Sequence, residues 1–337
     1  MEEMEVVEAL FHGDKEAQIQ AATEIGKLSS KQKHKLAEKG VISPLVVMLH
    51  SQDYEAIEAA LLALLSLAFG SERNKVRIAK SGALPVLLNL LQCQRESLMD
   101  LAIAALMILS SCAANKLAIA SSGAIQLLLE ILNIDYTHEN INNISMQAKL
   151  DTISTLHNLS TSPHITPSMV SSNVVVSLLQ LIYGTDKSSK LVEKAMALLE
   201  KIVSSSEIAL QETAGTGGAI QALVETIEEG SPQCKEHAVG ILLLICQSSR
   251  DTYRGLILRE GVMPGLLQVS VDGTWRAKEL AQDLLLLLRD CSSCGARSKQ
   301  LKNELVEQIM EEIDTGGEKV VGKALRLVEE MIEKLST

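Results

Sequence analysis

Apolar side chains gather in short blocks that recur along the chain. Residues 82–91 read Gly-Ala-Leu-Pro-Val-Leu-Leu-Asn-Leu-Leu, and residues 123–132 read Gly-Ala-Ile-Gln-Leu-Leu-Leu-Glu-Ile-Leu. Four weaker copies surround these two, and the steps between the anchor residues are 42, 41, 50, 45 and 43. The anchors are Gly40, Gly82, Gly123, Asn173, Gly218 and Gly261. This period predicts a helical solenoid, because one repeat cannot bury its apolar faces without its neighbours.

Each full repeat predicts a short first helix before the anchor, a second helix after it and a longer third helix. In the repeat anchored at Gly82 these helices are expected near 74–80, 84–92 and 98–112. The anchor suits the left-handed conformation that ends a helix, and Asn173 is the residue type after glycine that tolerates it best. Polar segments such as 51–53 and 230–232 supply N-cap groups for third helices.

The two ends of the chain and the step of 50 residues depart from the repeat pattern. Residues 1–39 hold an incomplete repeat, which we expect to cap the array at 40–294. Residues 295–337 place apolar side chains on single faces of two predicted helices, which either cap the last repeat or bind a partner or a second copy. The step of 50 includes a polar insertion at 133–146, expected on the surface as a tolerated loop or a partner contact.

Composition narrows the class of protein. Apolar residues make up 47% of the chain and aromatic residues 2%, which favours helices packed through Leu, Ala, Ile and Val. The net charge of −11 argues against nucleic acid as a partner. One basic cluster, spanning Lys27 to Lys39, is read as a solvated helix face, with an acidic-peptide or lipid-headgroup contact as the alternative.

The lengths of the apolar runs and the composition of the first residues predict where in the cell the protein is located. The longest apolar runs, 241–246 and 59–65, are far shorter than the roughly 18 residues of a membrane span. Residues 1–5 lack the basic region and apolar stretch of a secretion signal, so we expect a cytoplasmic protein, with the nucleus as a further location. The six cysteines are then expected to be reduced.

No catalytic, metal-binding or cofactor-binding constellation emerges. Cys291 and Cys294 have the spacing of a redox pair or half a zinc site, but two further ligands are missing and a helix precedes them. Incidental cysteines are the simpler interpretation. Residues 215–218 read Gly-Thr-Gly-Gly without the following Lys-Ser or Lys-Thr of a phosphate loop, so they predict a lengthened repeat turn.

The helix triplets, the Gly-Ala-Ile/Leu-Pro turn and the pairs Asn74-Lys75 and Asn115-Lys116 resemble the armadillo repeat over roughly residues 5–294. The resemblance implies an all-α, right-handed α-solenoid of about six to seven three-helix repeats with terminal caps. Residues 10–25 and 277–288 look like the armadillo region of plant U-box ubiquitin ligases. Nothing resembles the U-box itself, so ligase activity is not carried over.

Within that family, third helices of nuclear-import adaptors and catenin-like members carry Trp and, four residues on, Asn, which line the concave groove and clamp an extended peptide. Among the corresponding positions here only Asn158 matches, so the regular peptide ladder and an import-adaptor role are not expected. These positions are Thr23 and Lys27, Leu62 and Ser66, Met107 and Ser111, Ser154 and Asn158, Ala197 and Lys201, Gly240 and Leu244.

The resulting expectation is a non-enzymatic scaffold whose third helices bind a partner protein through the five pairs from Thr23 to Lys201. A groove of this length presents more than the roughly 800 Å² per side of a stable interface. The alternatives are a substrate-recognition subunit that acts in ubiquitin transfer through a separate ligase, and a redox protein using Cys291 and Cys294. We expect a monomer that needs no cofactor, with dimerisation through 295–337 as the alternative.

Overall fold

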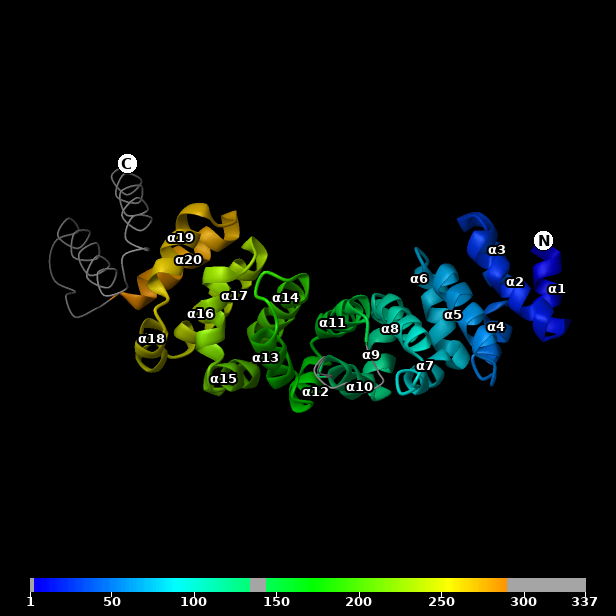
Figure 1. Ribbon diagram of the computed structural model, residues 1–337, viewed down its shortest axis with the longest axis horizontal. Coiled ribbons are helices and arrows are strands. Elements are labelled where there is room, and N and C mark those ends of the chain that lie inside the picture. The colour runs from blue at the N-terminus through cyan, green and yellow to red at the C-terminus, as the bar shows by residue number, and fades with distance from the viewer. Residues whose placement is uncertain (1–2, 134–143, 290–337) are drawn as a thin grey trace. The chain divides into compact units, whose positions relative to one another are not determined.

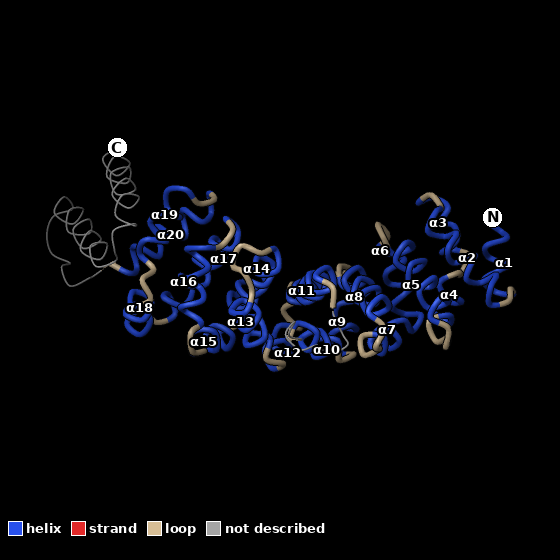
Figure 2. Tube along the Cα trace, viewed as in Figure 1, coloured by secondary structure: helices blue, strands red, loops and turns tan. Residues whose placement is uncertain are grey.

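The computed structural model describes residues 3–133 and 144–289, and the regular structure within those ranges is entirely helical (Figures 1 and 2). The third helices are α2 (Lys15–Lys27), α5 (Tyr54–Ala68), α8 (Glu96–Ser110), α11 (Met146–Ser160), α14 (Lys190–Ser205), α17 (Pro232–Ser248) and α20 (Trp275–Leu288). The second helices are α1 (Glu3–His12), α4 (Ile42–Met48), α7 (Leu84–Leu90), α10 (Ala124–Leu132), α13 (Val174–Gly184), α16 (Ala219–Glu229) and α19 (Met263–Asp272). The first helices are α3 (Ser30–Glu38), α6 (Glu72–Ile78), α9 (Ala113–Ser121), α12 (Thr166–Ser171), α15 (Glu207–Gly215) and α18 (Arg250–Arg259). A π-helical turn, η1 (Ala79–Ala83), joins α6 to α7.

The predicted left-handed stops are confirmed at every anchor. The five glycine anchors have φ between 75° and 88°, and Asn173 has φ 61°. Asn173 is the only non-glycine residue with positive φ in the described part of the chain. At Gly218 two features disfavour a side chain: φ is +80°, and a Cβ would collide with the Tyr183 hydroxyl. The repeat boundary is therefore fixed by backbone conformation at one residue.

Helix starts follow the expected capping chemistry. Asp53 accepts a hydrogen bond from the Glu55 amide at 3.0 Å, and Ser231 accepts one from the Cys234 amide at 3.2 Å. These bonds satisfy backbone donors that the first turn of a helix leaves unpaired. The third helix α8 differs, because Arg95 precedes it and makes no side-chain cap.

The recurring asparagines close the third helices. Asn74 Nδ2 donates to the Leu67 carbonyl at 2.9 Å, and Asn115 Nδ2 donates to the Leu109 carbonyl at 3.2 Å. Both carbonyls lie in the last turn of a third helix, where backbone acceptors lack partners within the helix. Asn115 also reaches the Lys75 carbonyl in the preceding repeat at 3.1 Å. The Asn of the repeated pair thus joins consecutive repeats.

The chain forms two compact bodies, Met1–Ser177 and Leu178–Thr337, which we call the N-terminal and C-terminal bodies. In the N-terminal body α2, α5, α8 and α11 pack in sequence, each against the next. In the C-terminal body α14, α17 and α20 do the same. Successive third helices therefore form a continuous layer within each body, as the repeat pattern predicts.

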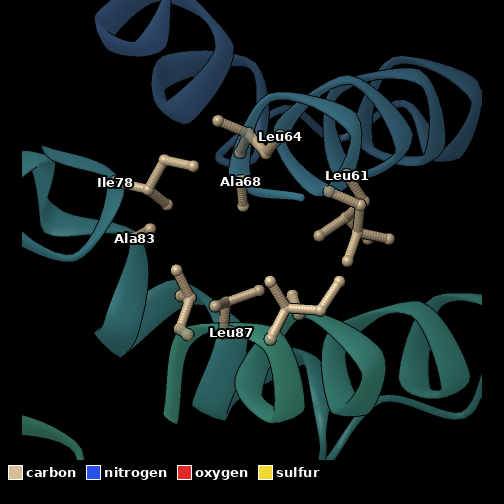
Figure 3. Close-up of a pocket in the computed structure, with 10 residues that line it drawn as sticks. Leu61, Leu64, Ala68, Ile78, Ala83 and Leu87 are labelled. Atoms are coloured by element: carbon tan, nitrogen blue, oxygen red, sulfur yellow. The ribbon is translucent and has the colours of Figure 1, made fainter. Parts of the chain in front are cut away.

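The apolar blocks fill the space between repeats. Figure 3 shows the interior between α5, α6, η1, α7 and α8, where the labelled side chains are Leu61, Leu64, Ala68, Ile78, Ala83 and Leu87. Packing leaves a void of about 10 Å³ lined only by Leu, Ile and Ala. A void of this size holds at most about one water molecule, and apolar voids stay dry. This interior stabilises the fold and leaves no room for a ligand.

Three predictions lie outside the described residues: the helix pair at 295–337, the thiol pair Cys291 and Cys294, and most of the insertion at 133–146. The domain limits 1–39, 40–294 and 295–337 remain a prediction.

Candidate functional site

The predicted contact residues of the N-terminal body share one surface. Thr23 lies on α2, Leu62 and Ser66 on α5, and Ser154 and Asn158 on α11. None of these side chains is buried. We call the solvent-facing side of α2, α5, α8 and α11 the third-helix face. The sequence alignment of helices therefore selected exposed positions on the intended helices.

Counting residues from the N-cap of each third helix shows that Met107 on α8 is not equivalent to Leu62 on α5. Leu62 lies nine residues after the N-cap Asp53, and Ser154 lies nine after the N-cap Ser145. Met107 lies twelve after Arg95, so the position equivalent to Leu62 is Ala104. Met107 is nevertheless half-buried and Ser111, the C-cap of α8, is exposed. Both residues still belong to the third-helix face.

The centre of this face is apolar. Leu62, Leu65 and Phe69 follow one another at helical spacing along α5, which places them on one side of the helix. Leu62 is 49% exposed and Phe69 is 81% exposed. On the neighbouring α8, Met107 and Ile108 are half-buried on the corresponding side. These five residues form what we call the apolar stripe.

Phe69 was missed by the sequence analysis. It lies sixteen residues after Asp53, and the equivalent positions sixteen residues after Arg95 and Ser145 are Ser111 and Thr161. A repeat alignment anchored on the ends of the third helices would have revealed an aromatic residue where other repeats carry hydroxyls. A phenylalanine exposed at that position contributes nothing to the core of its own repeat.

Lysines border the C-terminal ends of the third helices. Lys27 is the last residue of α2 and pairs with Glu24 at 2.6 Å. Lys75 Nζ donates to Ser111 Oγ at 2.8 Å, and Lys116 Nζ donates to Thr161 Oγ1. Cations are favoured there because the helix dipole places partial negative charge at the C-terminus. Two of these cations are paired with carboxylates, Lys27 with Glu24 and Lys75 with Glu72, which lies 2.5 Å away.

Asn158, the one match to the family's groove asparagine, holds two repeats together. Its Nδ2 atom donates to the Met107 carbonyl at 3.3 Å and to Ser110 Oγ at 3.0 Å, both on α8. The amide hydrogens that would bind a peptide backbone are thus engaged within the protein. Its role in partner binding remains a prediction.

The third helices of the C-terminal body carry an ion network as well as exposed apolar side chains, which include Trp275 and Leu286 on α20. Glu200 on α14 accepts from His237 on α17 at 2.6 Å and from Arg276 on α20 at 2.6 Å. Arg276 also binds Glu236 at 2.8 Å. Burial raises the pKa of the Glu200 carboxyl, but the hydrogen bonds from His237 and Arg276 outweigh burial and hold that pKa below its ordinary value.

The remaining predicted positions border this ion network. Ala197 and Lys201 lie on α14 three residues before and one residue after Glu200, and they are half-buried and exposed respectively. A Cβ at Gly240 would collide with the Glu200 carboxylate, so the glycine leaves room for the network. The predicted positions of the C-terminal body thus lie beside charged groups.

The described residues offer no group of three or more His, Cys, Asp or Glu placed to hold a metal ion. Burial raises the pKa of the Cys112, Cys234 and Cys246 thiols, which keeps them protonated and weakly nucleophilic. None of the helices in residues 3–133 and 144–289 has the length and apolar character needed to cross a bilayer.

Comparison with known families agrees with this architecture. Residues 29–69 match the armadillo/β-catenin-like repeat. Residues 126–305, more than half of the chain, match the ARM repeat region of plant U-box proteins. The chain belongs to this family. The predicted resemblance is confirmed, and we refer to the repeats below as the ARM array.

Relatives of the ARM array are longer proteins. U-box domain-containing protein 45 of Arabidopsis thaliana is 29% identical over 76% of this chain and 32% of its own length. U-box domain-containing protein 17 of the same plant is 31% identical over 87% of this chain and 39% of its own length. The chain thus spans between about a third and two fifths of the length of these two relatives.

Solved structures support the fold. An engineered protein superimposes with a TM-score of 0.72 at 20% identity, covering 97% of this chain and 77% of its own. A designed armadillo repeat protein superimposes with a TM-score of 0.62 at 19% identity, covering 74% of this chain and all of its own. The predicted all-α armadillo fold is confirmed.

Proposed function

We propose that this chain is a non-enzymatic adaptor that binds a partner protein on the third-helix face of its N-terminal body. The observation that carries the proposal is the exposure of Phe69, 81%, at a position where the next two repeats carry Ser111 and Thr161. Exposed aromatic side chains within a contiguous apolar patch mark interaction sites, and interface energy concentrates on such anchors.

The predicted contact residues take defined places in this proposal. Leu62 and Met107 contribute to the apolar stripe, and Thr23, Ser66, Ser111 and Ser154 surround it with hydroxyl groups. Lys27 contributes positive charge beside it. Ala197 and Lys201 belong to the C-terminal body, where they offer a second, polar contact region. The anchors are thus concentrated on α5 and α8, and we expect most of the binding energy there.

The test uses a photo-reactive p-benzoylphenylalanine in place of Ser66, between Leu62 and Phe69. Irradiation in a native plant extract, followed by mass spectrometry, identifies the proteins that contact the stripe. The matched control carries the same group at Gln126, an exposed residue of the second helix α10. We expect adducts at position 66 that are absent at 126 and are lost when Phe69→Ser is added. Adducts that persist with Phe69→Ser would show that the stripe does not bind the partner.

A second candidate is a substrate-recognition subunit that acts in ubiquitin transfer through a separate ligase. The family match favours it, because both curated relatives are named U-box domain-containing proteins. The same cross-linking experiment distinguishes the two. Recovery of ubiquitin-conjugating or ligase components with the Phe69-dependent partner supports this candidate, and repeated recovery of unrelated signalling or cytoskeletal proteins argues against it.

A further inference from the structure

The polar residues of the third-helix face already use their hydrogen-bond donors within the protein. The hydroxyl groups of Thr23, Ser111 and Ser154 donate at 2.9, 2.7 and 2.7 Å to carbonyls in the preceding turn. Asn158 uses both amide hydrogens on α8, so among the predicted hydroxyl and amide residues of this described face only Ser66 has an unused donor. An extended peptide needs donors for its carbonyls where water is excluded, whereas a helix bonds its own carbonyls. The face therefore suits a helix better than an extended chain.

The accessible side of α5 forms one line along the helix. Glu55, Glu58, Leu62, Leu65 and Phe69 follow one another at steps of three and four residues, and of these only Leu65 is half-buried while the others are exposed. Such steps keep side chains on one side of a helix. The apolar part, from Leu62 to Phe69, spans about 10 Å at about 1.5 Å per residue. Two turns of a second helix laid along α5 would cover it with apolar side chains at the same spacing.

Helix α8 widens this line. Leu65 on α5 and Ile108 on α8 line the same void between the two helices, so the apolar stripe continues from one helix to the other. Met107, beside Ile108, is half-buried on α8. A bound helix would therefore rest on α5 and also contact α8.

Glu58 gives this surface one charged end. Its carboxylate lies one turn before Leu62, is exposed, and forms no ion pair with the described residues. Helix α8 contains no Lys or Arg, and the cations at the neighbouring third helices have other contacts. Lys15 pairs with Asp53, Lys27 pairs with Glu24 at 2.6 Å, and Arg95 stacks on the Tyr54 ring at 4.3 Å. Glu58 is thus available to pair with a cation of the partner.

We propose that the partner in the proposed function, on which this assignment rests, binds through an amphipathic helix that lies along α5. Its apolar side chains contact Leu62, Leu65 and Phe69, and a lysine or arginine one turn beyond them pairs with Glu58. Such a partner keeps its backbone hydrogen bonds on binding, because each carbonyl in the middle of a helix is bonded within that helix. The cation fixes the direction of the bound helix, since only one orientation places it beside Glu58.

The probe is a fluorescein-labelled helical peptide, Gln-Ala-Lys-Ala-Gln-Ala-Leu-Ala-Gln-Leu-Ala-Gln-Ala-Trp-Ala-Gln-Ala, and fluorescence anisotropy follows its binding to the full chain. A first comparison peptide carries Pro in place of the Gln two residues before the Trp, on the side of the helix away from the apolar residues. We expect it to bind at least about tenfold more weakly, because Pro inside a helix costs about 3 kcal/mol. A second carries Glu in place of Lys, and we expect it to bind about threefold more weakly, as for an exposed ion pair.

The decisive variant is Glu58→Lys, a change at an exposed position of α5 that should leave folding intact. We expect it to reverse the preference, so that the Glu peptide binds about threefold more tightly than the Lys peptide. Glu229→Lys, at an exposed carboxylate of α16, makes the same charge change elsewhere and should keep the original preference. Phe69→Ser should weaken binding of the helical peptide about tenfold, because it removes the largest apolar contact.

The outcomes distinguish the helical partner from the proposed surface. Equal binding of the Pro and helical peptides, or an unchanged preference in Glu58→Lys, would overturn the proposal of a helical, basic partner. The same holds if the helical peptide fails to bind while position 66 still captures a Phe69-dependent partner. Binding that Phe69→Ser leaves unchanged would overturn the proposed function as well. A dimer in sedimentation that Phe69→Ser dissociates would assign the apolar stripe to a second copy of the chain instead.

Discussion

The guanidinium of Arg276 on α20 donates a 2.6 Å hydrogen bond to the carboxylate of Glu200 on α14, two repeats earlier in the chain. Helix α17 lies between them in the sequence and contributes His237 and Glu236 to the same network. Interactions in the ARM array otherwise join neighbouring repeats, so this pair couples three third helices directly. The C-terminal body should therefore lose cooperativity when the pair is broken.

Arg276→Ala tests this coupling. We expect the free energy of unfolding of the C-terminal body to fall by about 1–2 kcal/mol, a value reduced from that of a buried pair because Arg276 is 45% exposed. Urea denaturation followed by circular dichroism, together with hydrogen exchange of α17, measures the loss. Arg259→Ala, which removes an exposed arginine bonded only to its own helix, is the matched control. Equal effects of the two variants would rule out a special role for the network.

The same network predicts a pH dependence. The pKa values of Glu200 and Glu236 are lowered in the folded state, so their ionised forms stabilise the fold. That stabilisation is complete above the ordinary carboxyl pKa of 4.5 and is lost as pH falls through the lower, folded-state values. Glu200→Gln should flatten the decline in stability between about pH 5 and pH 3. Thermal unfolding at a series of pH values measures this, and an unchanged acid slope in Glu200→Gln would exclude Glu200 as a cause.

Asn115→Ala probes the junction between repeats. Asn115 is 3% exposed, and its amide satisfies the Leu109 and Lys75 carbonyls. Each carbonyl keeps a backbone donor, the Ala79 amide for Lys75 and the Cys112 amide for Leu109, so removing the Asn115 amide costs the net value of two hydrogen bonds, about 1–3 kcal/mol. Asn89→Ala, at an exposed position of α7, should change stability by less than about 0.5 kcal/mol. Denaturant midpoints of the two variants decide whether the repeated Asn is structural.

Phe69→Ser separates binding from folding. Because the ring is 81% exposed, the free energy of unfolding of the variant should lie within about 0.5 kcal/mol of that of the original chain. Partner binding, in contrast, should be lost. Met107→Glu should also lose the partner, but because Met107 is half-buried it should destabilise the fold more than Phe69→Ser. Asn158→Asp does not separate the two roles, because it removes the hydrogen bonds to Met107 and Ser110 and should lower the stability by about 1 kcal/mol. Comparing melting temperatures with pull-down yields for each single variant distinguishes the two roles.

Asn173 provides a test of the left-handed stop. With φ at 61°, Asn173→Ala should destabilise the N-terminal body by about 1–2 kcal/mol, because a Cβ without a compensating amide disfavours this conformation. Asn173→Gly should stay within about 0.5 kcal/mol, since glycine adopts the conformation freely. Differential scanning calorimetry of both variants gives the values. Equal stability of the two would show that the backbone at this turn relaxes.

Most of the fold could be predicted from the sequence because its signals are local. A left-handed stop, a capped start and an apolar block determine each repeat, and all three are visible in residue types at Gly82, Asp53 and 82–91. The register of α8 was harder to predict, because Arg95 does not cap and leaves the helix start unmarked. Met107 was accordingly placed three residues beyond the position equivalent to Leu62.

The candidate site could be predicted only in part. Leu62 could be identified by aligning the helices of the repeats. The exposure of Phe69 could not, because it depends on where α5 ends and on what lies beside that end. The ion network of Glu200, His237 and Arg276 joins residues 37 and 76 positions apart, and such contacts arise only once the helices are packed. Sequence periodicity gives the helix on which a side chain lies, whereas exposure and pairing are properties of the assembled layer.

The one-residue stops have an evolutionary consequence. Since each stop depends on its own φ angle and not on a distant contact, the length between stops is free to drift, and the spacing from Gly123 to Asn173 is 50 against 41 for the step before it. Duplication or loss of a whole repeat would preserve every remaining stop. A lineage can thus lengthen or shorten the array by gaining or losing whole repeats at these stops.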